Sequence, residues 1–110
     1  MSKLLTNLIA KAEKNGEAQI NGRYENGMNY TNEIVEKYHI MIQNNILSLR
    51  HWGTTTLIIN LNDHTVIHYY GISDSDRDSM NFICNHYNIP VRFRYLPSTK
   101  QFIMIQKGAN

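Results

Sequence analysis

The spacing of hydrophobic positions is helical at first, alternates in the middle of the chain and becomes helical again near residue 80. Over residues 2–15 the apolar side chains gather on one face of a helix, between an N-cap at Ser2 and a stop at Asn15-Gly16. The residues of this apolar face are Leu4, Leu5, Leu8, Ile9 and Ala12. We expect the face to pack on a sheet or on a second copy of the chain. In the second case Leu4, Leu5, Leu8 and Ile9 are the expected homodimer contacts.

The segment that follows contains three Asn-Gly pairs between residues 15 and 27. Asn-Gly is the preferred centre of a type I′ turn because both residues need a positive φ angle. We therefore predict a small hairpin of Glu17–Ile20 and Arg23–Asn26 around Asn21-Gly22. Such a hairpin buries few apolar side chains and is marginal on its own, so it is interpreted as an arm.

From Tyr38 onward apolar and polar residues alternate, which is typical of strands with one buried face. The predicted strands are residues 38–43, 46–52, 54–61 and 66–70. Asn44-Asn45 and Gly53 provide two of the turns, and the short links favour an antiparallel meander. The stretch Thr31–Tyr38 fits both a capped helical turn and a strand, and both alternatives stay open.

A second helix has the clearest local signals in the chain. Ser73 or Ser75 can cap it, and three aspartates at 74, 76 and 78 lie in its first turn, where the helix macrodipole favours anions. The stripe predicted to be buried consists of Met80, Ile83, Cys84 and Tyr87. Asn88 and Pro90 end the helix. Alternation then resumes over Val91–Tyr95 and Phe102–Gln106, which predicts a C-terminal hairpin.

The predicted fold class is α+β, with an N-terminal helix, an antiparallel β-meander, one helix and a C-terminal β-hairpin. We expect helices to cover one face of the sheet. Residues 1–32 are interpreted as an N-terminal amphipathic helix with an Asn/Gly-rich arm, and residues 33–110 as the α+β domain. A chain of 110 residues with 42% hydrophobic residues can build one such core.

Composition excludes several classes of protein. The single cysteine, Cys84, excludes an internal disulfide framework and a four-thiolate zinc site. A net charge of +2 is too small for a dedicated DNA binder and has the wrong sign for a protein that mimics DNA. We find no secretory segment and no apolar run of the roughly 20 residues needed to span a membrane, so we expect a cytoplasmic protein without a membrane partner.

No motif points to catalysis or to a cofactor. The acidic run Asp74–Asp78 resembles the start of a calcium loop but lacks its glycine and distal glutamate, and helix capping accounts for the carboxylates. The five histidines have no metal-ligand spacing, and Cys84 and His86 diverge on a helix. We therefore expect no catalytic residue, no metal and no cofactor, and a protein that is not an enzyme.

Two groups of residues are candidates for binding a partner. Trp52, Tyr69 and Tyr70 flank strand ends, and such aromatic residues dominate protein interfaces. Arg92, Arg94 and Lys100 lie in a C-terminal third that has no acidic residue after Asp78 and also contains Lys107. Arginines on a ribbon can pair with a partner's carboxylates or with phosphates, although four cations give only weak, salt-sensitive nucleic-acid binding.

Parts of residues 46–88 resemble a family of small uncharacterised proteins of Gram-positive phages and plasmids. The resemblance rests on His51-Trp52-Gly53-Thr54, on Leu57-Ile58-Ile59 and on Tyr70-Gly71-Ile72-Ser73-Asp74-Ser75-Asp76-Arg77-Asp78-Ser79-Met80-Asn81. It implies a phage, prophage or plasmid as the setting, and no activity. The 14 asparagines and 14 isoleucines, against 4 alanines, also suggest an AT-rich mobile element.

Together these observations predict a non-enzymatic accessory protein that binds a bacterial host or phage protein in the host cytoplasm. Inhibition of a host defence or replication factor fits that setting. The alternative is a small nucleic-acid-binding module that uses the basic C-terminal hairpin.

Overall fold

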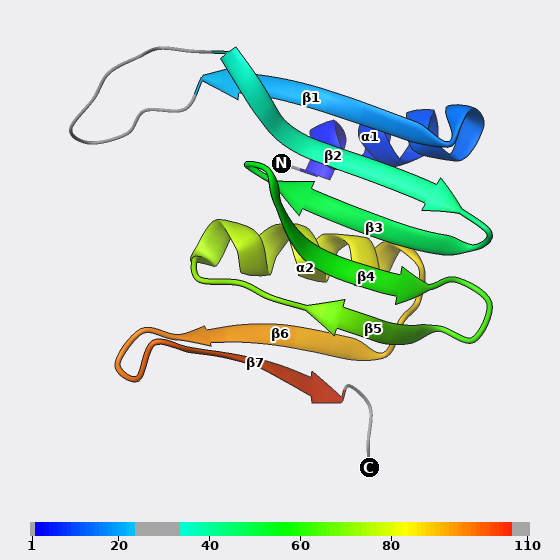
Figure 1. Ribbon diagram of the computed structural model, residues 1–110. Helices are drawn as coiled ribbons and strands as arrows, with labels where there is room; N and C mark the ends of the chain where they lie inside the picture. Colours follow the sequence, from blue (N-terminus) through cyan, green and yellow to red (C-terminus); the bar gives the residue numbers. More distant parts are fainter. Residues whose placement is uncertain (1, 24–33, 107–110) are drawn as a thin grey trace.

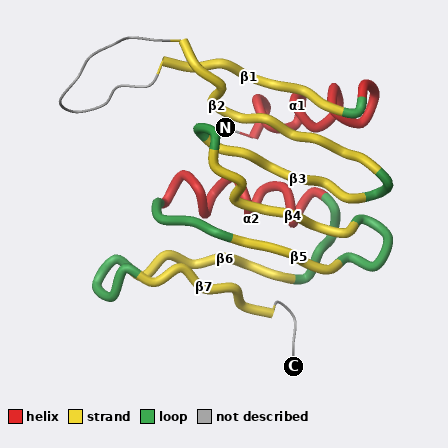
Figure 2. The backbone as a smooth tube through the Cα atoms, viewed as in Figure 1, coloured by secondary structure: helices red, strands yellow, loops and turns green. Residues whose placement is uncertain are grey.

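The structure is a computed structural model that describes residues 2–23 and 34–106. Its elements, in chain order, are α1 (Ser2–Asn15), β1 (Glu17–Arg23), β2 (Ile34–Gln43), β3 (Ile46–His51), β4 (Thr54–Asn60), β5 (Thr65–Tyr69), α2 (Asp74–His86), β6 (Val91–Leu96) and β7 (Gln101–Gln106). Figure 1 shows both helices on the same side of the strands, and Figure 2 shows the same layering. The predicted α+β class and element order are confirmed.

Strands β1 to β5 form one antiparallel sheet in chain order, and β6 and β7 form a separate antiparallel hairpin. The β2–β3 turn has Asn44 at φ 53° and Asn45 at φ 62°, the positive angles that a type I′ turn needs. Asparagine tolerates this region better than most residues because its short side chain bonds locally. The turn predicted at these positions is confirmed.

The core lies between the helices and one face of the sheet. The predicted apolar face of α1 is buried there, with Leu5, Leu8, Ile9 and Ala12 at most 1% exposed. From α2, the predicted residues Met80, Ile83 and Cys84 are fully buried, and Tyr87 packs against the same cluster. The tyrosine also links the helices, because its hydroxyl donates to Glu13 over 2.9 Å.

The hairpin predicted around Asn21-Gly22 is wrong. β1 runs without a turn from Glu17 to Arg23 and pairs along its whole length with β2, with one irregularity between Ile20 and Asn21. The reason is tertiary: once α1 is packed on the sheet, Ala18 and Ile20 face the core opposite Ile40 and Tyr38. A long partner strand therefore outweighs the local turn preference of one Asn-Gly pair.

Helix and strand were both open for the stretch Thr31–Tyr38, and the structure shows a strand from Ile34 onward, where β2 begins. Residues 31–33, the rest of the predicted hairpin at 24–26 and the boundary predicted at 32/33 lie outside the described residues. No helix in the described part of the chain is long and apolar enough to cross a membrane.

Candidate functional site

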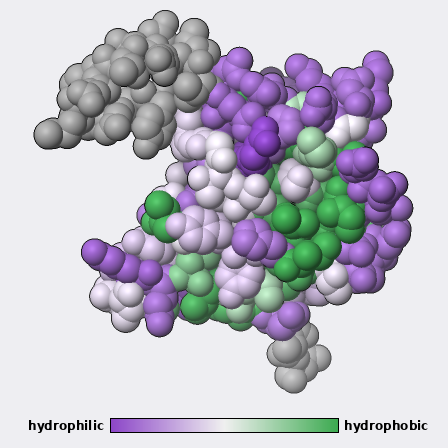
Figure 3. All heavy atoms as spheres, viewed as in Figure 1, coloured by the Kyte–Doolittle hydropathy of each residue, from purple (hydrophilic) through white to green (hydrophobic). Residues whose placement is uncertain are grey.

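Exposed apolar side chains concentrate at the end of β5. Four of the six large hydrophobic residues exposed in the described chain lie within residues 67–72: Ile67 (56% exposed), Tyr69 (38%), Tyr70 (48%) and Ile72 (65%). We call these four residues the β5 apolar segment. In Figure 3 the largest hydrophobic area lies where β3 and β5 begin and β4 ends, more lies along the hairpin, and a small separate one lies near the end of β5.

The rest of the molecule fixes the backbone of this segment. Tyr70 N–H donates to the Thr56 carbonyl over 2.9 Å, and the Tyr69 ring lies 5.4 Å from the Phe93 ring of β6. Gly71 is buried so closely against the Phe102 ring of β7 that a Cβ atom at this position would lie 2.5 Å from it. Glycine therefore permits the close contact between the end of β5 and the hairpin. The exposed side chains are held on an ordered support.

The predicted basic residues lie on the outer face of the hairpin. Arg92 and Arg94 are exposed and alternate with the buried Val91 and Phe93, as the sequence pattern predicts. Lys100 is exposed in the β6–β7 turn, and Lys107 lies outside the described residues. Across the ladder, Arg92 lies opposite Ile105 and Arg94 opposite Ile103, so two half-buried isoleucines share this face.

These two guanidinium groups differ from those of the other arginines whose side chains are described. Arg50 forms a two-bond ion pair with Glu36, at 2.9 and 2.8 Å, and Arg77 pairs with Asp74 and Asp78. Within residues 2–23 and 34–106, no carboxylate lies within ion-pair distance of Arg92 or Arg94. Both cations are therefore available to an external anion.

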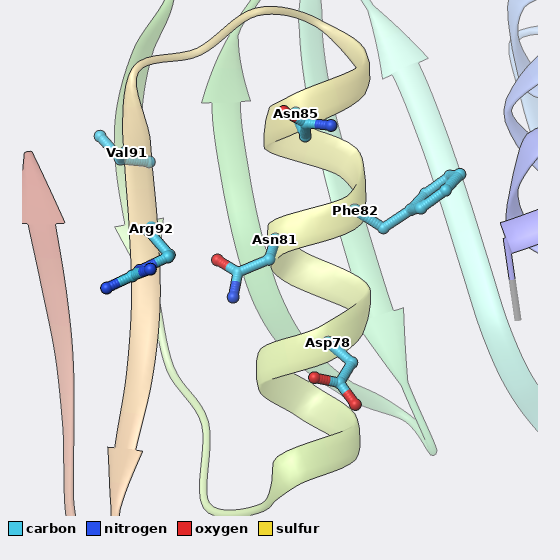
Figure 4. Close-up of a pocket in the computed structure, with 6 residues that line it drawn as sticks. All are labelled: Asp78, Asn81, Phe82, Asn85, Val91 and Arg92. Atoms are coloured by element: carbon cyan, nitrogen blue, oxygen red, sulfur yellow. The ribbon is translucent and has the colours of Figure 1, made fainter. Parts of the chain in front are cut away.

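A shallow groove of about 370 Å³ separates β6 from the outward side of α2 (Figure 4). Its lining residues are Asp78, Asn81, Phe82, Asn85, Val91 and Arg92. Asn81 spans the groove, because its amide oxygen accepts from Phe93 N–H over 2.6 Å and its amide nitrogen donates to the Phe93 carbonyl over 3.0 Å. This side chain satisfies the edge of β6 that faces α2 as a neighbouring strand would.

A polar cluster is buried where α2 begins. His51 Nδ1 lies 2.7 Å from Asp76 Oδ1, and both residues are buried. Asp76 also accepts from Ile72 N–H over 3.0 Å, while its own N–H donates to the Ser73 hydroxyl, the N-cap of α2. The His51 ring stacks on Tyr38 with centroids 4.5 Å apart. The cluster therefore joins β2, β3 and α2.

Electrostatics agree with a charged Asp76. Burial by itself raises the pKa of this carboxyl, but the hydrogen bonds from His51, Ile72 and Ser73 outweigh it and hold the pKa below its ordinary value. Burial raises the pKa of the neighbouring Tyr38 phenol. The acidic run was predicted to cap the helix, and the Ser73 cap and first-turn Asp74 and Asp76 agree with that prediction.

Sequence reasoning missed the His51–Asp76 pair. The two residues are 25 positions apart, and only the packing of α2 over the end of β3 brings them together. No spacing within the sequence could have indicated it. In the described part of the chain no three His, Cys, Asp or Glu side chains gather as a metal site.

The structure divides the predicted partner-binding residues between two places. Trp52 is half-buried at the β3–β4 turn, against Gly22 of β1 and with its ring 5.9 Å from Lys37 Nζ. Tyr69 and Tyr70 lie instead at the end of β5, beside the hairpin that carries the arginines.

Of the residues predicted for a homodimer, Leu5, Leu8 and Ile9 are buried within a single chain, and Leu4 alone is exposed, at 38%. The face packs on the sheet of its own chain, which was the first of the two expectations. The three buried leucine and isoleucine side chains have no surface left for a second copy.

A scan against protein-family models and searches of curated proteins and of solved structures found no match. The relationship to phage and plasmid proteins therefore stays a prediction.

Proposed function

We propose that this protein is a non-enzymatic binding protein that acts by contacting another protein through the β5 apolar segment. The observation that supports the proposal is the exposure of Ile67, Tyr69, Tyr70 and Ile72 within six residues. Single exposed apolar residues are common on soluble proteins, but four large ones within six residues are a concentration that is typical of an interaction site. Tyrosine is also enriched among the residues that dominate binding energy.

The ordered support strengthens the proposal. A partner that binds Tyr70 and Ile72 finds their backbone already fixed by bonds to Thr56 and Asp76, so little conformational entropy is lost on binding. In the setting that the sequence predicts, the partner is a bacterial host or phage protein, and the accessory role is inhibition of a host defence or replication factor.

Affinity capture from a lysate of Gram-positive bacteria tests this function, followed by titration of the captured protein in purified form. We expect the variant Tyr70→Ser/Ile72→Ser to lose capture, because it removes the two exposed side chains and leaves the backbone bonds of the segment in place. The matched control is Leu4→Ser, which removes an exposed apolar side chain from α1 and should bind as the original protein does.

Circular dichroism of each variant checks that the fold is intact. Equal binding by the β5 variant and the original protein would show that this surface is not the contact. Capture of no protein above background would contradict the proposed function as a whole.

A further inference from the structure

The hairpin leaves one strand edge open. Of the edge strands, β1 carries the charged Glu17 and pairs irregularly with β2 next to Ile20, and β5 contains a bulge, because Ile67 has no partner in the ladder with β4. The free side of β6 is bonded to Asn81. β7 has a regular register over Gln101–Gln106 and contains no charge, proline or glycine. It therefore lacks the features that normally protect an edge from pairing with another strand.

The bonds between Asn81 and Phe93 show which backbone groups of β7 face outward. Phe93 directs its N–H and C=O toward Asn81 and so away from β7, and in the ladder Phe93 lies opposite Met104. Residues opposite each other in an antiparallel pair either both bond across it or both point away. The N–H and C=O of Met104 therefore point to the free side of β7. This outward direction repeats every second residue, so the N–H and C=O of Phe102 and Gln106 also point to the free side.

Two faces flank this edge. The side chains of Phe102 and Met104 lie on the inner face of the hairpin, where both pack against the core cluster. Ile103 and Ile105 lie on the outer face, directly beside Arg94 and Arg92. A strand added to β7 would therefore meet apolar residues on the inner face, and apolar residues followed by two cations on the outer face.

Charge decides what kind of strand fits. The hairpin carries Arg92, Arg94 and Lys100, and its described residues 91–106 contain no carboxylate. A second copy of this hairpin would bring three more cations to the same surface, which is unfavourable. An acidic strand would instead give the two free guanidinium groups the carboxylate partners that Arg50 and Arg77 already have.

A nucleic acid fits less well. The aromatic rings of the hairpin, Phe93, Tyr95 and Phe102, belong to the face opposite the arginines and cannot stack bases beside them. The outer face between the arginines and the open edge is formed by isoleucines, and the groove next to Arg92 is lined by Asp78. A continuous row of phosphates would meet apolar side chains and a carboxylate there.

We infer that β7 binds an extended peptide segment of another protein as an added antiparallel strand, and that acidic and apolar residues alternate in that segment. The peptide bonds to the outward N–H and C=O groups of Phe102, Met104 and Gln106. Its apolar side chains lie on the inner face, and its carboxylates lie over Ile103 and Ile105 and reach Arg92 and Arg94. This inference rests on the proposed function, since it names the chemistry of a partner segment.

A fluorescent peptide of about seven alternating glutamate and valine residues tests the inference by fluorescence anisotropy at low salt. We expect saturable binding to the full-length protein and none for a peptide of alternating lysine and valine. The variant Arg92→Glu/Arg94→Glu should weaken binding by about tenfold or more. The control Lys3→Glu/Lys11→Glu makes the same change in net charge on exposed positions of α1 and should bind normally.

Two isomeric peptides test the strand geometry without altering the protein. A peptide N-methylated on its valines loses the N–H groups that should face β7, and we expect it not to bind. The isomer N-methylated on its glutamates loses only N–H groups that face away, and we expect it to bind. Equal behaviour of the two isomers, or equal binding of the glutamate variant and the lysine control, would overturn the inference.

Two further results would also overturn it. A dimer in light scattering that dissociates in the Arg92→Glu/Arg94→Glu variant would assign the edge to a second copy. Binding of a single-stranded oligonucleotide that the peptide cannot displace would assign the arginines to a nucleic acid. If the peptide fails while lysate capture still depends on Tyr70 and Ile72, the added strand is wrong and the proposed function stands.

Discussion

At the scale of single residues, the His51–Asp76 pair is the interaction with the clearest consequence. Asp76 accepts hydrogen bonds from the His51 ring and from Ile72 N–H at the point where α2 begins. The variant Asp76→Asn keeps the shape of the side chain but removes the charge and one acceptor oxygen. We expect the free energy of unfolding at pH 7 to fall by about 1–3 kcal/mol, because buried donors lose their partner.

The same residue gives a pH dependence with a definite sign. Because the pKa of Asp76 is lower in the folded state than the ordinary value of an aspartate carboxyl, its contribution to stability is present above that ordinary value and is lost as the pH falls through the folded pKa. Urea unfolding of the original protein and of Asp76→Asn should therefore show a clear difference at pH 7 that narrows as the pH falls below the ordinary aspartate pKa of about 3.9. A difference that stays constant over this range would contradict the assignment of a charged Asp76.

At the scale of elements, Asn81 connects α2 to the hairpin through both backbone groups of Phe93. We expect Asn81→Ala to lower stability by about 1–2 kcal/mol, because two groups lose their partner beside a partly open groove. Asn81→Asp retains the acceptor for Phe93 N–H and places a second oxygen against the Phe93 carbonyl, so it should rescue only part of the loss. Chemical unfolding of the two variants measures this order, and full stability in Asn81→Ala would show that the contact is dispensable.

Elements with strong local signals could be predicted from the sequence, and tertiary pairings could not. The Asn44-Asn45 turn, the capped helix after Ser73 and the alternation in β6 each depend on neighbouring residues, and each is present. β1 was predicted only as far as Ile20 and with the wrong partner, because β2 lies beyond a long connection and its pairing overrides the Asn21-Gly22 turn signal. The same limit applies to the site: exposed Arg92 and Arg94 followed from alternation, but the bond of Asn81 to Phe93 did not.

At the scale of the whole molecule, α1 is part of the one core that all other elements share. Its residues Leu5, Leu8 and Ile9 are buried in the same cluster as Leu57 of β4 and Ile83 of α2. We expect Leu8→Ala to cost about 2–5 kcal/mol, which is a large share of the stability of a domain of this size. Thermal unfolding followed by circular dichroism measures the loss, with Leu4→Ala as the control at an exposed position of the same helix. A similar loss in both variants would contradict the burial of this face.

The division of the strands into a five-stranded sheet and a separate two-stranded hairpin has a consequence for motion. No backbone ladder joins the two parts, so the hairpin is held by side-chain packing and by Asn81. Amide protons of β6 and β7 should therefore exchange with deuterium sooner than those of β3, through openings that leave the larger sheet closed. A peptide strand bound along Gln101–Gln106 would slow that exchange. Binding at this outer edge would therefore be detected as stronger protection of amide protons in both strands of the hairpin.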